Sequence, residues 1–248
     1  MEWKAFRSTR ACAAGVLPVA VDGQGQVHLL LGRESSWRSK NSHAGTWCDF
    51  GGVIRNNRCS FSGAAREFVE ETLGTVLGHM STHLTTRHIL SHRCVSLRSM
   101  FGQVVPYDMH VVLVPFNQDI PQLFQNKLKA CFTGNVGLPV WIYDKKGQVR
   151  SVFTEKDSLQ WVKLEELWTI VHKFPFLRGQ HIRLRKEFKQ TLQMQWKILH
   201  AATEMCRKYC AVPQQNAYCQ ESNDTDTLRE TSTSSISSTS TGQDQSQT

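Results

Sequence analysis

The chain has 248 residues and a formal net charge of +8, and 40% of its residues are hydrophobic. The length alone allows one or two domains, and the composition agrees with one domain plus appended segments. The last 29 residues hold five acidic side chains and one basic side chain, so residues 1–219 carry a net charge of +12. A body this basic favours polyanionic partners, chiefly nucleic acid or phosphate-rich small molecules.

No apolar run approaches the roughly twenty residues that span a bilayer, so we expect no membrane segment. The basic residues 1–10 followed by the apolar residues 11–21 resemble a targeting peptide, but the apolar run also fits a first core strand, which we favour. The eight cysteines include no Cys-x-x-Cys pair, which indicates a reducing compartment without disulfides or zinc sites. We expect a cytoplasmic protein; a mitochondrial or nuclear location and the oligomeric state stay open.

Three apolar segments in the first fifty residues predict β-strands. Residues 14–21 and 27–34 are rich in Val and Leu, and Asp22-Gly23-Gln24-Gly25 between them is typical of a hairpin turn. Residues 46–52 predict a third strand that runs into a double glycine. The sequence therefore starts as a small sheet.

The polar segment between the second and third strands combines aromatic rings with cations. Such a combination suits stacking on a nucleobase beside contacts to phosphate. The candidates are Trp37 and Phe50 for a base and Arg33 and Arg38 for phosphate. The alternative for Trp37 is a lid over the core.

An acidic helix is expected after the double glycine. Glu67, Glu70 and Glu71 are related as i, i+3 and i+4, so they lie on one narrow face of a helix. Carboxylates this close repel one another unless a cation lies between them, and an all-oxygen site suits Mg²⁺ or Mn²⁺. The alternative is a solvated acidic face.

The ends of this helix are also predicted. Ser60 or Ser62 is expected to cap its start by accepting a backbone hydrogen bond, and Gly74 is expected to end it in the left-handed conformation. The face opposite the glutamates is mostly apolar and should pack inward. Its members are Ala64, Ala65, Phe68 and Leu73.

The middle of the chain gives weaker signals. His79, His83, His88 and His92 have helical spacing, but the residues between them favour strand or loop, where the histidines would not converge on a metal. Further elements are predicted as a buried strand at 109–116, a helix at 120–132 within an insertion at 117–140, and a late strand with a short helix at 159–167.

The last third of the chain predicts a basic helix and a tail. Apolar residues from about 177 to 209 follow a mostly helical spacing, so one side of this helix should pack on the domain. The cations expected to remain outside, where they would contact RNA phosphates, are Arg178, Arg183, Arg185, Lys186 and Lys189. A merely solvated basic face is the alternative. Residues 213–248 are rich in Ser, Thr and Gln and predict a disordered tail.

The double glycine and the acidic helix together resemble the signature of the Nudix hydrolases. Gly52 matches the first glycine of that signature, and the segment Arg66-Glu67-Phe68-Val69-Glu70-Glu71 matches its acidic core. Arg58 stands where the family has its first glutamate. Leu73 takes the place of the last glycine, which follows one residue late as Gly74.

The resemblance covers about residues 11–172 and implies an α/β fold of the α+β type. In this fold a mixed sheet is sandwiched between helices, here with a C-terminal helical extension. The implied segments are an arm at 1–10, a Nudix domain at 11–175, the basic helix at 176–212 and the disordered tail at 213–248.

The resemblance also implies a hydrolase that cleaves the pyrophosphate linkage of a nucleoside diphosphate joined to another moiety. It does not imply which substrate; the basic body and the C-terminal helix favour a nucleotide-containing one, with capped RNA as a particular candidate. Mg²⁺ or Mn²⁺ would be held by Glu67, Glu70, Glu71 and Gly52, one glutamate would act as the base, and Arg66 would orient a neighbouring carboxylate. A later acidic residue, Glu155 or Asp157, would complete the site.

Arg58 leaves open both its own role in the site and whether the chain is an active enzyme. It would either contact substrate phosphate or lower the number of bound cations. With the excess of positive charge it also motivates a second hypothesis, a catalytically weak or inactive Nudix-fold module that binds RNA.

Overall fold

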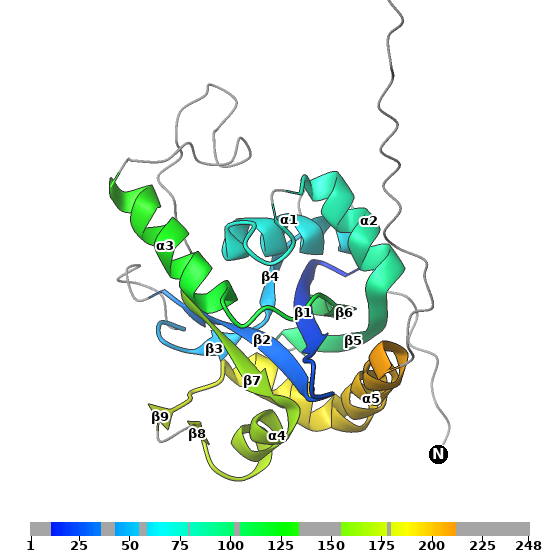
Figure 1. Cartoon of the computed structure of the whole chain (residues 1–248). Coiled ribbons are helices and arrows are strands. Elements are labelled where there is room, and N and C mark those ends of the chain that lie inside the picture. Colours follow the sequence, from blue (N-terminus) through cyan, green and yellow to red (C-terminus); the bar gives the residue numbers. More distant parts are fainter. Residues whose placement is uncertain are drawn as a thin grey trace, which may run out of the picture. The chain divides into compact units, whose positions relative to one another are not determined.

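A computed structural model describes residues 11–35, 43–54, 59–78, 80–101, 105–133, 155–177 and 180–211, all within the compact unit Met1–Pro213. The expected arm at 1–10 and tail at 213–248 lie outside the described residues. The elements in chain order (Figure 1) are β1 (Ala13–Val21), β2 (Val27–Glu34), β3 (Trp47–Cys48), β4 (Phe50–Val53), α1 (Ser60–Thr72), α2 (Thr82–His92), β5 (Arg93–Phe101), β6 (Val105–Leu113), α3 (Ile120–Thr133), β7 (Lys156–Lys163), α4 (Leu164–His172), β8 (Phe176–Leu177), β9 (Gln180–His181) and α5 (Lys186–Ala211).

The main sheet is mixed, with a strand order of β3-β2-β1-β6-β5. β1 and β6 run parallel, and the other pairs are antiparallel. The first half of β1 pairs with β4, whereas its second half, from Val19, pairs with β2. β7 then joins the far side of β2. Along this edge of β1, β4 is therefore the neighbour of the first half and β2 is the neighbour of the second half. α1 is the next element after β4 in the chain.

The predicted hairpin between β1 and β2 is present. Asp22 accepts hydrogen bonds from the backbone N–H groups of Gln24 and Gln26, each at 2.9 Å, and Gly25 takes a φ of +76°. His28 lies 2.8 Å from the other oxygen of Asp22. The short polar side chain and the glycine together close the turn without strain.

Helices cover both faces of the sheet. On one face the core joins strand residues to α1, α2 and α3, through side chains such as Phe68, Ile89 and Phe124. On the other face it joins them to α4 and α5, through side chains such as Leu167 and Leu192. Figure 1 shows α1 and α2 on one side of the sheet and α4 and α5 on the other. The predicted fold class, a mixed sheet between helices with a C-terminal helix, is confirmed.

The C-terminal helix begins later than predicted. The two short strands β8 and β9 occupy part of the range 176–181, and α5 starts only at Lys186. Ile182 and Leu184 are buried, with exposed Arg183 between them, which is the alternation of an extended segment and not of a helix. Leu184 bridges to Trp47 in β3. α5 also contains a kink at Gln195, where the backbone leaves the helical region.

Two further local predictions were wrong. The segment from Thr82 to His92 is helix α2, capped by the Ser81 side chain, and not strand or loop. The N-cap of α1 is Cys59 and not a serine; Ser62 lies within the helix, and the Ser60 hydroxyl lies 2.7 Å from Nε2 of His110. A tertiary partner for Ser60 therefore replaces the expected local cap.

The end of α1 agrees with the prediction and adds to it. Gly74 takes a φ of +63°, and Leu73 before it takes a φ of +52° although it is not a glycine. The Leu73 side chain is buried in the core, and burial of this side chain offsets the strain of its backbone. Among the described residues, no helix has the length and the apolar character that crossing a membrane requires.

Candidate active site

The double glycine of β4 allows unusually close contacts. A Cβ atom on Gly51 would lie 2.3 Å from the Tyr107 hydroxyl oxygen and 2.6 Å from Cα of Gly15, so β1, β4 and Tyr107 fit together only without that side chain. A Cβ atom on Gly52 would lie 2.5 Å from Oε1 of Glu67. The Glu67 carboxylate of α1 therefore lies directly against the backbone of β4.

A buried hydrogen bond lies beneath the double glycine. The Tyr107 hydroxyl donates to Oδ2 of Asp49 over 2.5 Å, and both side chains are buried. Burial raises the pKa of Asp49, although the Tyr107 bond opposes this effect. Burial and the Asp49 charge together raise the pKa of Tyr107 well above its usual value. The pair holds β6 against β3 and β4, which fixes the floor of the site.

Arg66 lies between two of the predicted carboxylates. Its Nη1 donates to Oε2 of Glu70 over 2.8 Å, and its Nη2 donates to Oε1 of Glu67 and to the Val53 carbonyl oxygen. Glu67 is buried, whereas the Glu70 side chain is 48% exposed. Burial raises the pKa of Glu67 and Arg66 partly offsets this, while the nearby Glu70 and Glu155 charges add to the rise.

Glu71 is the most deeply buried carboxylate of the helix. Its Oε1 lies 3.4 Å from Nζ of Lys156, and its Oε2 is buried with no hydrogen-bond partner among the residues that the structure describes. Burial raises the pKa of Glu71 well above its usual value; Lys156 opposes this rise, and Glu34, Glu155 and Glu67 add to it. One oxygen of Glu71 is therefore available to a ligand.

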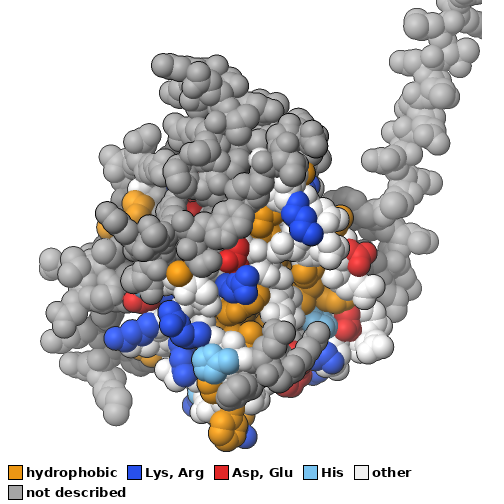
Figure 2. Space-filling view, turned by 90° about the vertical axis from the view of Figure 1, so that its left-hand side faces the viewer, with side chains coloured by type: hydrophobic (Ala, Val, Ile, Leu, Met, Phe, Trp, Pro, Cys, Tyr) orange, Lys and Arg blue, Asp and Glu red, His pale blue; other side chains and the backbone are white. Residues whose placement is uncertain are grey.

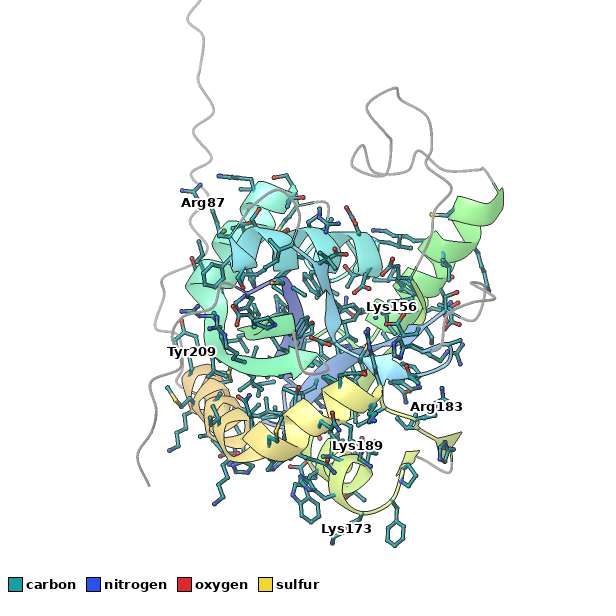
Figure 3. The ribbon with its side chains drawn as sticks, turned by 180° about the vertical axis from the view of Figure 1, so that it is seen from behind. Arg87, Lys156, Lys173, Arg183, Lys189 and Tyr209 are labelled. Carbon is teal, nitrogen blue, oxygen red and sulfur yellow. The ribbon has the colours of Figure 1, made fainter. Side chains whose placement is uncertain are left out.

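Lys156 is a buried residue of the candidate site that sequence reasoning missed. It lies at the start of β7, only 1% exposed, and Nζ donates to Oε1 of Glu34 over 2.8 Å and to the Cys48 sulfur over 3.1 Å. Figure 3 shows its side chain in the interior, on the α1 side of the sheet. A lysine three positions before the apolar alternation that starts at Leu159 looks like a solvated strand end, so the pattern gave no signal of burial.

Lys156 and Glu34 stabilise each other's charged forms. Burial alone would lower the pKa of Lys156, but Cys48, Glu71 and Glu34 raise it well above its usual value, so the ammonium stays charged. Burial alone would raise the pKa of Glu34, but Lys156 and Arg185 hold it below its usual value. Arg185 lies 3.5 Å from Oε1 of Glu34, so the expectation that it remains outside on the basic face was wrong.

The residues that the sequence predicted to contact the substrate lie in different parts of the structure. Phe50 is fully buried against the Phe68 ring, 5.6 Å away, so its prediction as a base platform was wrong. Arg33 pairs with Asp157 over 2.6 Å between Nε and Oδ1, and its side chain remains 43% exposed. Glu155 is half-buried, and its charge affects Glu67 and Glu71, whereas Asp157 faces Arg33. The remaining candidates, Trp37, Arg38 and Arg58, lie outside the described residues.

The side chains of this site fit a hard divalent cation. The available ligand atoms are carboxylate oxygens, which suit Mg²⁺ or Mn²⁺, and Oε2 of Glu71 is buried without a hydrogen-bond partner in the described part of the chain. Glu67 lies on the same helix face, next to the Gly52 backbone. In the described ranges, no group of three or more His, Cys, Asp or Glu side chains is spaced to hold a metal ion. Glu67 and Glu71 with Gly52 are the residues that would hold one.

Comparison with known proteins gave structural neighbours only. No protein-family model and no curated protein sequence matches the chain. A Nudix hydrolase from M. smegmatis aligns over 77% of this chain and 88% of its own, with 13% identity and a TM-score of 0.35. An Ap4A hydrolase from C. elegans aligns over 76% and 98%, with 14% identity and a TM-score of 0.40. A bifunctional NMN adenylyltransferase/ADP ribose pyrophosphatase from Francisella tularensis, complexed with AMP and a manganese ion, aligns over 79% and 43%, with 12% identity and a TM-score of 0.41.

Proposed function

We propose that the chain is a Nudix-type pyrophosphohydrolase that depends on Mg²⁺ or Mn²⁺. Its substrate would be a nucleoside diphosphate linked to another moiety. The observation that carries the proposal is the buried pair Glu67 and Glu71 on one face of α1, with Glu67 packed against Gly52 and with Oε2 of Glu71 left without a hydrogen-bond partner among the described residues. Carboxylates buried at such cost are typical of a site that binds a cation.

The roles of the individual residues follow from their positions. A bound divalent cation would neutralise charge on the diphosphate as the linkage breaks. Arg66 fixes Glu67 by hydrogen bonding and keeps Glu70 close to it. Glu70 is the most exposed of the three carboxylates, so it is placed to accept a proton from a water molecule that enters from solvent. The Arg33 side chain is 43% exposed beside Asp157, and it would contact substrate phosphate.

The experiment that tests this function is a turnover assay on a panel of substrates. The panel holds nucleotide sugars, dinucleoside polyphosphates, ADP-ribose and capped RNA, each assayed with Mg²⁺, with Mn²⁺ and with a chelator. Metal-dependent release of a phosphate-containing product on any of them supports an enzyme. No product on the whole panel, with or without metal, contradicts it.

Two variants connect turnover to the acidic helix. Glu71→Gln and Glu70→Gln should each lower turnover at least about a hundredfold, because each removes a charge that acts on the transition state, while the fold stays intact. The matched control is Glu165→Gln, which removes an exposed carboxylate from the first turn of α4. Full activity in Glu71→Gln, or an equal loss in Glu165→Gln, would contradict the assignment.

Capped RNA is the substrate that the charge distribution favours within this class. Arg183 and Lys186 are exposed and Lys189 is half-buried at the start of α5. Figure 2 shows Lys and Arg side chains gathered on one face of the molecule, and Figure 3 shows Arg183 and Lys189 on the α5 side. Such a surface would hold the phosphates of an RNA chain whose capped end enters the acidic site.

A non-catalytic RNA-binding module is the second candidate. The observation that favours it is Lys156, an internal cation that already occupies space beside Glu71. The same panel separates the two candidates, since tight RNA binding without any product supports the binding module.

A further inference from the structure

The ammonium of Lys156 lies at a point that three elements share. Lys156 comes from β7, Glu34 from β2 and Glu71 from α1. Its Nζ is 2.8 Å from Oε1 of Glu34, 3.4 Å from Oε1 of Glu71 and 3.1 Å from the Cys48 sulfur. Two carboxylates and a thiol thus surround one positive charge in the interior, as ligands surround a metal ion.

The fold provides space for this one side chain. A Cβ atom on Gly32 would lie 3.0 Å from Cδ of Lys156 and 2.8 Å from Cε1 of Phe50, so the lysine passes over a position that has no side chain. Lys156 is paired with Glu34 across β2 and β7, next to a register shift after Arg33. A buried charge is unfavourable unless it is paired and hydrogen-bonded, and both conditions are met here.

The two oxygens of Glu71 have different surroundings. Oε1 faces the ammonium, whereas no described residue offers a hydrogen bond to the buried Oε2. One end of the carboxylate is therefore neutralised from within the protein. The other end remains for a ligand from outside.

We propose that Lys156 acts as a built-in cation of the acidic site, in place of a divalent ion between Glu34 and Glu71. It is a positioning residue, because it holds Glu71 through one oxygen and leaves the other oxygen for the metal. This inference rests on the proposed function, in which Glu67 and Glu71 hold that metal. It predicts that the site takes up one divalent cation fewer than it would without the lysine.

Two substitutions separate the charge of Lys156 from the space that it fills. Lys156→Ala removes the ammonium and leaves room between Glu34 and Glu71, where a divalent cation can enter because carboxylate oxygens are its preferred ligands. Lys156→Met also removes the ammonium but fills the space with an unbranched apolar chain. Lys129→Ala, on the exposed side of α3, is the control for loss of one positive charge.

The experiment measures the number of Mn²⁺ ions bound per chain by calorimetry, and the melting temperature with and without Mn²⁺. Lys156→Ala should bind about one more equivalent of Mn²⁺ than the wild-type chain, because two buried carboxylates have lost their cation. Its melting temperature should rise with Mn²⁺ by several degrees more than that of the wild type. Lys156→Met should gain less, and Lys129→Ala should behave as the wild type.

A double variant keeps the test decisive if Lys156→Ala does not fold. The double variant Lys156→Ala, Glu34→Gln removes one charge of each sign and still leaves Glu71 without its ammonium. Folding that returns on addition of Mn²⁺, in either variant, supports the proposal. A folded variant that binds no more Mn²⁺ than the wild type overturns it, and so does failure of both variants to fold in the presence of Mn²⁺.

Failure of this inference differs from failure of the proposed function. Metal-dependent turnover in the wild type, with an unchanged Mn²⁺ count in Lys156→Ala, contradicts only the role of Lys156. No Mn²⁺ binding and no turnover in the wild type contradict the proposed function, whereas a gain of Mn²⁺ in Lys156→Ala would still show that the lysine occupies a cation position.

Discussion

Substitution of Gly52 by alanine should damage the site and spare the fold. An added Cβ atom at this position would lie 2.5 Å from Oε1 and 2.6 Å from Cδ of Glu67. Non-bonded heavy atoms are comfortable at about 3.5 Å, so the carboxylate must withdraw by about 1 Å. The atoms in the way are the end of a flexible side chain, which means that Glu67 moves and the β4 backbone does not.

The size of the effect follows from that displacement. A shifted Glu67 rotamer costs about 1 kcal/mol of stability. A misplacement of about 1 Å in a site that depends on orientation costs about a hundredfold in rate. We therefore expect Gly52→Ala to lower kcat/KM about a hundredfold and to weaken Mn²⁺ binding, with a loss of only about 1 kcal/mol in the free energy of unfolding.

The neighbouring glycine supplies the matched control. A Cβ atom on Gly51 would lie 2.3 Å from the Tyr107 hydroxyl oxygen, 2.6 Å from Cα of Gly15 and 2.8 Å from the Ala14 carbonyl oxygen. Two of these neighbours are backbone atoms of a central strand, so Gly51→Ala should cost about 3 kcal/mol or more. Urea unfolding, Mn²⁺ calorimetry and turnover on both variants check the contrast. The reasoning is refuted if Gly52→Ala keeps wild-type metal binding and turnover, or if it is destabilised as much as Gly51→Ala.

Two further predictions concern pH and salt. Burial lowers the pKa of His110 from its usual value of 6.5 to about 4. Between these two pH values the His110 side chain is protonated in the unfolded chain but not in the native chain. The free energy of unfolding should therefore fall by up to about 3 kcal/mol as the pH drops from about 6.5 to 4. Urea unfolding of His110→Gln should show a smaller loss over this window; an equal loss would contradict the burial argument. Reversal of Arg183, Lys186 and Lys189 to Glu should reduce the slope of log K against log salt for RNA binding by about 2, because each phosphate contact contributes about 0.7 to it. Lys129→Glu should leave the slope unchanged, and an unchanged slope in the triple variant would remove these residues from the RNA surface.

The parts of the fold that the sequence predicted are those set by short-range patterns. The hairpin at Asp22-Gly23-Gln24-Gly25, the strands around it and the acidic helix from Ser60 all depend on residues close together in the chain. Turn chemistry and apolar periodicity act over the same distance. The face that holds Glu67 and Glu71 follows from helical spacing alone, since α1 runs unbroken from Ser60 to Thr72.

The parts that the sequence did not predict depend on partners far along the chain. Ser60 does not cap α1, because His110 of β6 offers it a hydrogen bond. Residues 182–184 alternate between buried and exposed because Leu184 lies beside Trp47 of β3. Phe50 was predicted as a base platform together with Trp37, but the Phe50 ring packs against Phe68 in the core. In each case a contact more than ten positions away overrides the local preference.

Lys156 is the most consequential of these long-range effects. Its Nζ meets the Glu34 carboxylate 122 positions away in sequence, and Cys48 lies 108 positions away. No local pattern can link such positions, because lysine before a strand is ordinarily solvated. Lys156 is buried because β2, β7 and α1 meet around it in the folded chain. A buried Glu71 carboxylate without a cation beside it would destabilise the fold more than one that is paired with Lys156. The acidic helix alone predicted that a positive charge must lie beside its carboxylates, and the folded chain supplies part of that charge from its own sequence.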